Sequence, residues 1–332
     1  MDLIKTDQYG RPAGIVNGSK SDFEISVDGA NDFEIEMKRW EWDGSITYGT
    51  RVYAADTEYG GIVQEFSTDT STDVIRLQGD TWRGMMQHKI IEPQPGQDYA
   101  TASGELNDII RSKVENEFPG LFYGVDVNTG VTVQNYQFIR YCTLHNGLTK
   151  MLKSVGYRLD IRYKEGDVGM AGYVKVQAVP INDLSDRHEL TNDNNMHFTT
   201  DNNQRGINHL ICLGKGELKD RIVIHLYVDQ NGDISQSNKY FTGSDEITAI
   251  YDSGGSEEDE LIKNGIKELE SKKSNMSYNM TMTQLDGDID LGDVVGGKDY
   301  LTGISMQKPI SRKIWTVSSG KEKITYKLEG ET

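Results

Sequence analysis

Cysteine and proline are both scarce in this chain of 332 residues. The two cysteines, Cys142 and Cys212, lie far apart in the sequence. Two thiols alone cannot form a structural zinc site, and a reducing cytosol disfavours a disulfide. We therefore expect two buried free thiols. Six prolines against 35 glycines indicate many turns and few rigid linkers.

The sequence also lacks a long apolar run. The segment from Met1 to Tyr9 has neither the basic start nor the apolar stretch of a signal peptide. No stretch approaches the roughly 20 apolar residues of a membrane-spanning helix. We therefore expect a protein that is made soluble in a cytoplasm and has no membrane partner.

Positive charge is in deficit. Lys and Arg number 35 against 52 Asp and Glu, which gives a formal net charge of −17 at pH 7. Phosphate binding relies on Lys and Arg, so this balance argues against sequence-specific binding of nucleic acid. An acidic excess keeps a protein soluble. It would also suit a surface past which DNA must slide without sticking, and the two interpretations are compatible.

Motifs for the common catalytic chemistries are missing. The chain has no G-x-S-x-G nucleophile elbow, no Walker loop and no dinucleotide fingerprint. The acidic run from Glu257 to Glu260 suits the first turn of a helix, where carboxylates complement the dipole. Several histidines are scattered without metal-binding spacing, namely His88, His188, His197, His209 and His225.

Two segments carry part of a metal-binding pattern. Cys142 and His145 have the C-x-x-H spacing of half a site, but no second half lies nearby. Asp286–Asp290 holds three alternating carboxylates, as a calcium loop begins. Leu291 then stands where such a loop needs Gly, and Gly297 where it needs Glu. We therefore expect no catalytic residue, no cofactor-binding residue and no metal-binding residue.

Short segments of alternating apolar and polar residues dominate the first 95 positions. Asp28–Asp32 is a cluster of turn residues between two of these segments. Gly60–Phe66 and Asp73–Gly79 read as a hairpin with a long polar tip. The alternation predicts strands over Phe23–Val27, Phe33–Met37, Arg51–Ala55, Gly60–Phe66 and Asp73–Gly79. Such a meander suits a small barrel or sandwich.

Helical spacing appears in the middle of the chain. A first helix has Ser103 as its expected cap and ends at Pro119-Gly120, with Leu106, Ile109, Ile110 and Val114 on one face. A second begins near Thr143 and stops at Gly156, with Leu144, Leu148, Met151, Leu152 and Val155 on its apolar face. Two paired strands are expected after it, over Tyr157–Tyr163 and Tyr173–Val179.

The last third returns to strands. Leu184–Gln204 is rich in Asp and Asn and is expected to be a loop or linker. A third helix is expected near 257–273, capped by Ser256 with Asp259, with Leu261, Ile262, Ile266 and Leu269 as its buried face. Strands are expected over Asn208–Leu213, Asp220–Asp229, Ser277–Gln284, Val294–Ile304, Lys308–Val317 and Lys323–Leu328, with a tight turn at Asn231-Gly232.

Trp40 and Trp42 place two indoles on one side of an extended segment. Packing in the core is the default expectation for such residues. A protein contact is the second interpretation, because Trp is enriched at interface anchors. A platform for sugar stacking is the third.

Four segments, in this order, resemble the hub family of phage tails. That family includes the siphophage tail-tip hubs and the hub of PBSX-type contractile tails, which are relatives of the myophage baseplate hub. The segments are Gly60–Val63 with the strand ending at Asp80, where the family usually has Arg; Leu213–Glu217 with the strand to Asp229; Tyr251-Asp252 with Leu261–Leu269; and Asp290–Val295 with the last strand ending at Glu331.

The resemblance implies an α+β chain with two small tail-tube-like β-barrels and α+β inserted domains. The first barrel would span residues 1–95, the α+β insert 96–204, and the second barrel 205–332 with the inserted helix near 257–273. Three subunits would form a homotrimeric ring that joins the hexameric tail tube to the central spike or tip. The implied partners are the tail tube or distal tail protein, the spike, the tape-measure protein and baseplate proteins.

The expected location is the tail of a virion or of a phage-tail-like particle assembled in the bacterial cytoplasm. An acidic lumen would help DNA to pass. Two other functions stay open at this point. A tail-associated peptidoglycan hydrolase or peptidase would need catalytic motifs that the sequence lacks. A carbohydrate-binding receptor module is supported by Trp40, Trp42 and the tyrosine content.

Overall fold

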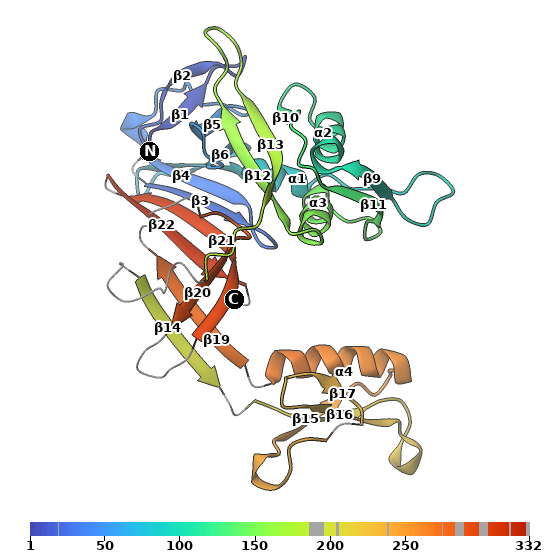
Figure 1. Cartoon of the computed structure of the whole chain (residues 1–332). Coiled ribbons are helices and arrows are strands. Elements are labelled where there is room, and N and C mark those ends of the chain that lie inside the picture. Colours follow the sequence, from blue (N-terminus) through green and yellow to red (C-terminus); the bar gives the residue numbers. More distant parts are fainter. Residues whose placement is uncertain are drawn as a thin grey trace. The chain divides into compact units, whose positions relative to one another are not determined.

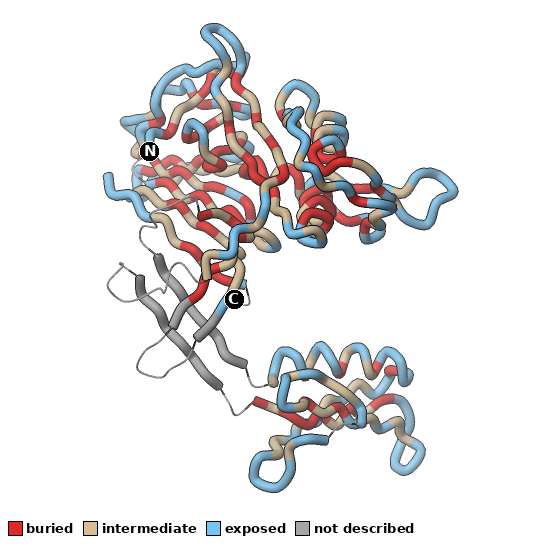
Figure 2. The backbone as a smooth tube through the Cα atoms, viewed as in Figure 1, coloured by how far each residue is buried: buried red, intermediate tan, exposed pale blue. Residues whose placement is uncertain are grey.

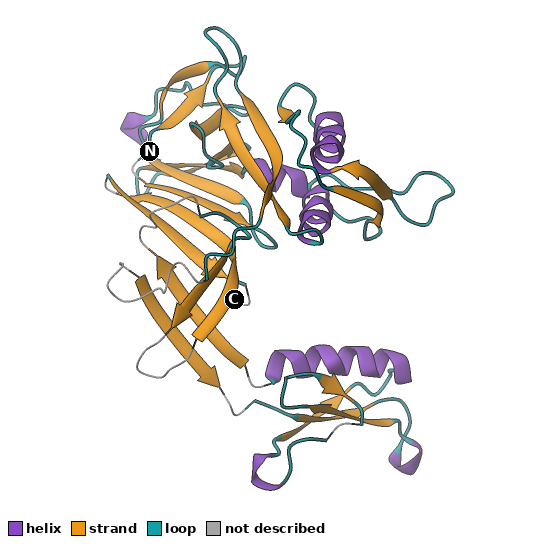
Figure 3. Ribbon diagram, viewed as in Figure 1, coloured by secondary structure: helices purple, strands orange, loops and turns teal. Residues whose placement is uncertain are grey.

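The computed structural model describes residues 1–18, 20–185, 196–203, 206–237, 239–273, 275–282, 289–298, 305–318 and 320–329 (Figure 1). The chain divides into two compact units. The first comprises Met1–His197 and Met280–Glu329, and the second is built on Phe198–Asn279. Strands outnumber helices in both units (Figure 3). None of the described helices has the length and apolar character that crossing a bilayer requires.

The largest sheet of the first unit joins strands from both ends of the sequence. It contains β3 (Lys20–Ser26), β4 (Asp32–Lys38), β7 (Glu65–Asp69), β8 (Val74–Asp80), β20 (Val294–Lys298), β21 (Ser305–Ser318) and β22 (Lys321–Leu328). The order is β20-β21-β3-β4-β8-β7, with β22 also paired to β21. Alternation buries Phe23, Ile25, Phe33 and Ile35 on one face, which confirms the two predicted strands. Strands predicted for two different barrels therefore share one sheet.

A four-stranded sheet lies beside it, with the order β2-β1-β5-β6. Its strands are β1 (Leu3–Thr6), β2 (Pro12–Ile15), β5 (Arg51–Ala54) and β6 (Gly60–Ile62). The prediction of one strand over Gly60–Phe66 was wrong, because β6 pairs with β5 while β7 pairs with β8. The two parts separate at Val63, which is fully buried. Gly61 allows the close approach of β6 to β8, since a Cβ there would lie 2.1 Å from the carbonyl oxygen of Asp80.

Helices cover one face of a third sheet in the first unit, as Figure 1 shows. The sheet has the order β10-β13-β12, from β10 (Phe122–Gly124), β12 (Tyr157–Lys164) and β13 (Tyr173–Pro180). The helices are α1 (Trp82–Gln87), α2 (Leu106–Glu117) and α3 (Leu144–Lys153). The predicted apolar faces of α2 and α3 form the buried core with this sheet (Figure 2). The expected pairing of β12 with β13 is confirmed, and the two strands are antiparallel.

The structure confirms where α3 begins and corrects the expected cap of α2. Helix α3 begins near Thr143 as expected, and the Thr143 side chain caps it by accepting from the Asn146 amide. Ser103 does not cap α2, because it lies in β9 (Thr101–Glu105), which pairs with β11 (Thr132–Gln137). Glu105 is the cap, and its carboxylate accepts a hydrogen bond from the Asp108 amide at 3.0 Å. A long side chain replaces the short hydroxyl that sequence rules favour at this position.

The second unit packs one helix on a small mixed sheet. The sheet has the order β17-β16-β15-β18, from β15 (His209–Leu213), β16 (Val223–Val228), β17 (Ile234–Ser235) and β18 (Thr248–Asp252). The expected helix is α4 (Glu258–Lys272). Leu261 and Leu269 are buried as predicted, but Ile266 is exposed and Gly265 takes the buried position against Cys212. The predicted cap is also wrong, because Glu257 holds that position without a side-chain hydrogen bond.

The remaining elements revise one prediction. β14 (Met196–Asn203) pairs with β19 (Asn275–Met282), so Leu184–Gln204 is not wholly a loop. Short 3-10 turns are η1 (Arg39–Glu41), η3 (Leu218–Asp220) and η4 (Gly243–Asp245). The described strands form open sheets that do not close into a barrel. The two barrels and the three domain ranges therefore stay predictions. Asp286, Asp288, His188, Gly303 and Ile304 lie outside the described residues.

Candidate functional site

A buried ion pair lies at the centre of the first unit. Thr81 caps α1 by accepting a hydrogen bond from the Gly84 amide, and this turn directs Arg83 inward. Its guanidinium donates to Glu58, with Nε–Oε1 at 2.6 Å and Nη2–Oε2 at 3.1 Å. Both side chains are almost fully buried. Burial lowers the pKa of Arg83, but the Glu58 carboxylate outweighs it and holds that pKa above its usual value.

Lys313 of β21 extends this pair into a cluster. Its Nζ lies 2.5 Å from Asp290 Oδ1 and 3.6 Å from Glu58 Oε2. Burial alone would raise the pKa of Asp290, but the Lys313 ammonium and then Arg158 lower it to about 2. Asp290 is therefore an ion-pair partner.

Two arginines of β12 complete the cluster. Arg158 binds Asp293 bidentately, with Nε–Oδ1 at 2.8 Å and Nη2–Oδ2 at 3.2 Å. Arg162 donates to Asp160 at 3.0 Å. The four cations Arg83, Arg158, Arg162 and Lys313 thus face the four anions Glu58, Asp160, Asp290 and Asp293. We call these eight residues the charge cluster. It links segments from the start, the middle and the end of the sequence.

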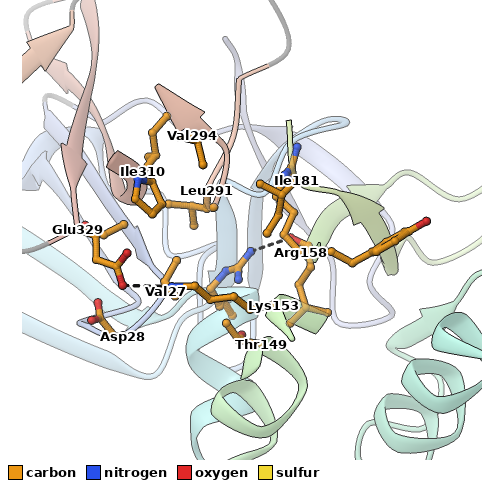
Figure 4. Close-up of a pocket in the computed structure, with 16 residues that line it drawn as sticks. Val27, Asp28, Thr149, Lys153, Arg158, Ile181, Leu291, Val294, Ile310 and Glu329 are labelled. Carbon is orange, nitrogen blue, oxygen red and sulfur yellow. Dashed lines mark hydrogen bonds and ion pairs between the residues drawn. The ribbon is translucent and has the colours of Figure 1, made fainter. Parts of the chain in front are cut away.

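A cavity of about 110 Å³ lies against the charge cluster (Figure 4). Apolar side chains form most of its wall, namely Val27, Leu159, Ile181, Leu291, Val294, Pro309 and Ile310. Lys153 and Glu329 form an ion pair of 3.2 Å beside it, as the dashed line in Figure 4 marks. Two buried polar atoms among its lining residues, Arg158 Nη1 and Thr149 Oγ1, have no hydrogen-bond partner within the part of the chain that is described. His and Cys are absent from this described lining.

Two histidines that look isolated in the sequence meet in the second unit. His209 Nε2 lies 2.8 Å from His225 Nδ1, and His209 Nδ1 lies 2.7 Å from Glu246 Oε1. Antiparallel pairing of β15 with β16 brings the two rings together. The sequence could have indicated this contact, because the two histidines lie on one face of two predicted neighbouring strands. His88 lies 3.0 Å from Asp80.

The remaining candidates have ordinary structural surroundings. Cys142 and Cys212 are buried and free, which confirms that prediction. Burial raises the pKa of Cys212 to about 11, so its thiol stays protonated at neutral pH. Burial, and then the charge of Arg83, lowers the pKa of His145 to about 3. Among the described residues, no group of three or more His, Cys, Asp or Glu side chains is placed to hold a metal ion.

The two indoles separate in the structure. Trp40 is 72% exposed in η1, so its expected place in the core was wrong. Trp42 is half-buried and meets Phe66 edge-on, with ring centroids 5.6 Å apart. Lys38 lies over the Trp40 ring at 5.9 Å. The exposed indole keeps the protein-contact interpretation open, since large exposed aromatic side chains are common interface anchors.

No protein-family model matches the sequence, and no curated protein matches it. Solved structures do. The 43 kDa tail protein of prophage MuSo2 from Shewanella oneidensis matches with a TM-score of 0.52 and 14% identity, covering 99% of this chain and 98% of that chain. Prophage tail protein gp18 from Listeria monocytogenes matches with a TM-score of 0.47 and 13% identity, covering 100% and 95%. A chain of the phage P2 baseplate matches with a TM-score of 0.49 and 11% identity, covering 99% of each.

The likeness to the Shewanella oneidensis prophage protein extends over nearly the whole of both chains. This chain therefore has the fold of a prophage tail protein.

Proposed function

We propose that the protein is a structural hub of a phage-type tail. Three copies form a ring that joins the hexameric tail tube to the central spike or tip. The observation that carries this proposal is the end-to-end likeness of the fold to a prophage tail protein. The order of four hub-like segments in the sequence supports it independently of the fold.

The charge cluster suits a part that must hold its shape. Eight charged residues from distant segments fix β12, α1 and β21 against one another. A buried pair contributes less to net stability than its attraction suggests, because desolvation offsets much of the gain. Its geometric demands instead favour one arrangement of the strands, which suits a ring component that transmits force along a tail.

The proposal includes the finer architecture implied by the resemblance. Each subunit would present two tube-like barrels, built on residues 1–95 and 205–332 around the α+β insert 96–204. Three subunits would then offer six similar surfaces to a six-fold tube. Tube or distal tail protein, spike, tape-measure protein and baseplate proteins are the proposed partners. The location is the virion tail or a tail-like particle, assembled in the bacterial cytoplasm.

We also propose that the protein is not an enzyme. The cavity beside the charge cluster has apolar walls, and the described thiols are buried and protonated at neutral pH. Asp290, Arg83 and Lys313 form ion pairs with other residues of the charge cluster, which gives them a structural role. A wall-degrading activity of the purified chain, measured on isolated sacculi, would contradict this part of the proposal.

Native mass spectrometry and sedimentation velocity test the ring. We expect a species of three times 37.3 kDa at micromolar concentration. On co-expression with tail tube protein, particles should carry one such ring at one tube end, because closed symmetry stops further growth. A monomer that persists at all concentrations and does not join tubes would contradict the hub.

A further inference from the structure

The outer face of the sheet β10-β13-β12 carries features that the hub role does not use. Its inner face packs in the core through Val174 and Val176. The outer face carries Tyr173 and Lys175 of β13, since these positions alternate with the buried ones. Tyr123 of β10 is the register partner of Lys175. Two tyrosines and one lysine therefore gather on the outer face of this sheet.

A groove of about 550 Å³ runs between residues 120–127 and 171–175. Tyr123 and Tyr173 line it in edge-to-face contact, with centroids 5.3 Å apart and planes at 79°. The Tyr123 side chain is 44% exposed, so its ring is open to a ligand. Asp126 and Gly172 also line the groove. This volume falls within the roughly 300–1,000 Å³ of ordinary ligand sites.

Some of the charged side chains around the groove have ion-pair partners within the described part of the chain and one does not. Arg162 is the register partner of Lys175 and is paired with Asp160, while Lys164 is paired with Asp56. Among the residues that the structure describes, Lys175 has no ion-pair partner. The carboxylate of Asp126 accepts from Arg111 at 2.7 Å and is 95% exposed. A chain with a net charge of −17 thus keeps one unneutralised ammonium beside two aromatic rings.

This set of groups matches one class of ligand. The C–H face of a sugar ring packs on an aromatic face, and its hydroxyls pair with carboxylates and main-chain groups. The Lys175 ammonium adds a charge-assisted contact to a uronate, phosphate or sialate group. An apolar ligand would leave Asp126 and Lys175 without new partners, so it fits less well. We propose that this groove binds an anionic saccharide.

Saccharide binding by this groove goes beyond the hub role and does not depend on it. Its biological use rests on the proposed function: contact with an acidic polymer of a cell surface, close to where a tail meets that surface. The binding energy would come from stacking on Tyr123 and Tyr173, and the selectivity for charge from Lys175. These two contributions belong to different side chains, so they can be removed one at a time.

A microarray of bacterial polysaccharides with acidic and neutral members tests the proposal, followed by calorimetry with an oligosaccharide of the strongest binder. We expect acidic members to bind the full-length protein. Tyr123→Ala should weaken that binding about tenfold or more. Lys175→Gln should remove the preference for acidic over neutral members. Tyr99→Ala is the matched control, since Tyr99 is similarly exposed at 47% and lies outside the groove, and it should bind as the wild type does.

Absence of binding to every acidic member would overturn the proposal. So would binding that Tyr123→Ala leaves unchanged, or a wild type that prefers neutral members. Sedimentation velocity on the same samples shows whether the variants keep the oligomeric state of the wild type. A trimer without saccharide binding would overturn this site alone, and a saccharide-binding monomer would overturn the ring alone.

Discussion

At the scale of single residues, Asp290 shows why charges are hard to assign from sequence. It ends a row of alternating carboxylates, Asp286, Asp288 and Asp290, and the next charged residue after it is again acidic, Asp293. Its partner Lys313 lies on β21, 23 positions further along the chain, with Nζ 2.5 Å from Oδ1. Only the fold brings the two together. The charge cluster as a whole was missed because its members come from distant segments with no shared motif.

Replacement of Asp290 by Asn should reveal the contribution of this pair. The pKa of Asp290 is lowered to about 2 in the folded chain, against an ordinary value of 3.8. A carboxylate with a depressed pKa stabilises the fold fully above its unfolded pKa. That stabilisation is lost as the pH falls through the folded pKa. The wild type should therefore lose stability between about pH 4 and pH 2.

Denaturant unfolding from pH 7 to pH 2 provides the measurement. At pH 7, Asp290→Asn should cost about 3–5 kcal/mol, because Lys313 loses its nearest anion in a buried site. The variant should then lose less further stability in acid than the wild type does. The exposed, unclustered Asp167→Asn serves as control and should match the wild type throughout. Parallel pH profiles for wild type and Asp290→Asn would contradict the assignment.

Trp40 carries a second prediction at this scale. Because its side chain is 72% exposed, Trp40→Ala should change the unfolding free energy by less than about 0.5 kcal/mol. If the indole anchors a protein contact, the variant should lose about tenfold or more in trimer formation or in co-purification with tube protein. Tyr141→Ala, at 56% exposure, is the control. Wild-type behaviour of Trp40→Ala in both assays would rule out the anchor.

At the scale of elements, the sequence predicts whether a segment is a helix or a strand better than it predicts which strands pair. Helices α2, α3 and α4 follow from apolar spacing, and β3, β4, β12 and β13 follow from alternation. Caps depend on which side chain reaches the first turn, so Glu105 replaced the expected Ser103. The break between β6 and β7 depends on a neighbouring strand that alternation cannot show. Pairing of β3 with β21 joins positions almost 300 residues apart, which no local pattern encodes.

Gly61 tests the contact that separates β6 from β7. A methyl group there would lie 2.1 Å from the Asp80 carbonyl oxygen, which belongs to the backbone and cannot rotate away. Gly61→Ala should therefore destabilise the fold by about 1–3 kcal/mol, the usual cost of overpacking. Gly255→Ala is a matched control, because nothing lies within 4 Å of its Cβ position and its φ is not in the left-handed region. Equal thermal midpoints for the two variants would contradict this account of the strand break.

At the scale of the whole molecule, the sequence resemblance and the fold lead to the same class. The four hub-like segments suggest a tail hub, and the fold of the chain matches a prophage tail protein along nearly its full length. The candidate saccharide groove was harder to predict from the sequence than the fold was. The saccharide groove needs β10 beside β13. This parallel pairing spans β11, α3 and β12 in the sequence, and alternation alone does not specify it. The two barrels remain part of the proposal.

The acidic excess provides the last prediction. In the proposed ring, we expect part of the net charge of −17 to line the central channel. A negative channel repels DNA phosphates over a range of roughly 8–10 Å at ordinary ionic strength, so a passing genome finds no site at which to stick. The simpler alternative places the same charge on the outer surface, where it only maintains solubility. The two alternatives predict different charge maps for the same ring.

A cryo-electron microscopy structure of the ring on its tube separates them. Asp and Glu should outnumber Lys and Arg among the side chains that face the channel. The isolated ring should also fail to retard duplex DNA in a gel even at low salt, where screening is weakest and any basic lining would act most strongly. A neutral or basic channel would contradict the expectation that acidic residues line it, but it would not contradict the trimeric ring. The charge of the channel and the number of subunits are thus decided by separate measurements, because one depends on where the carboxylates lie and the other on how the subunits pack.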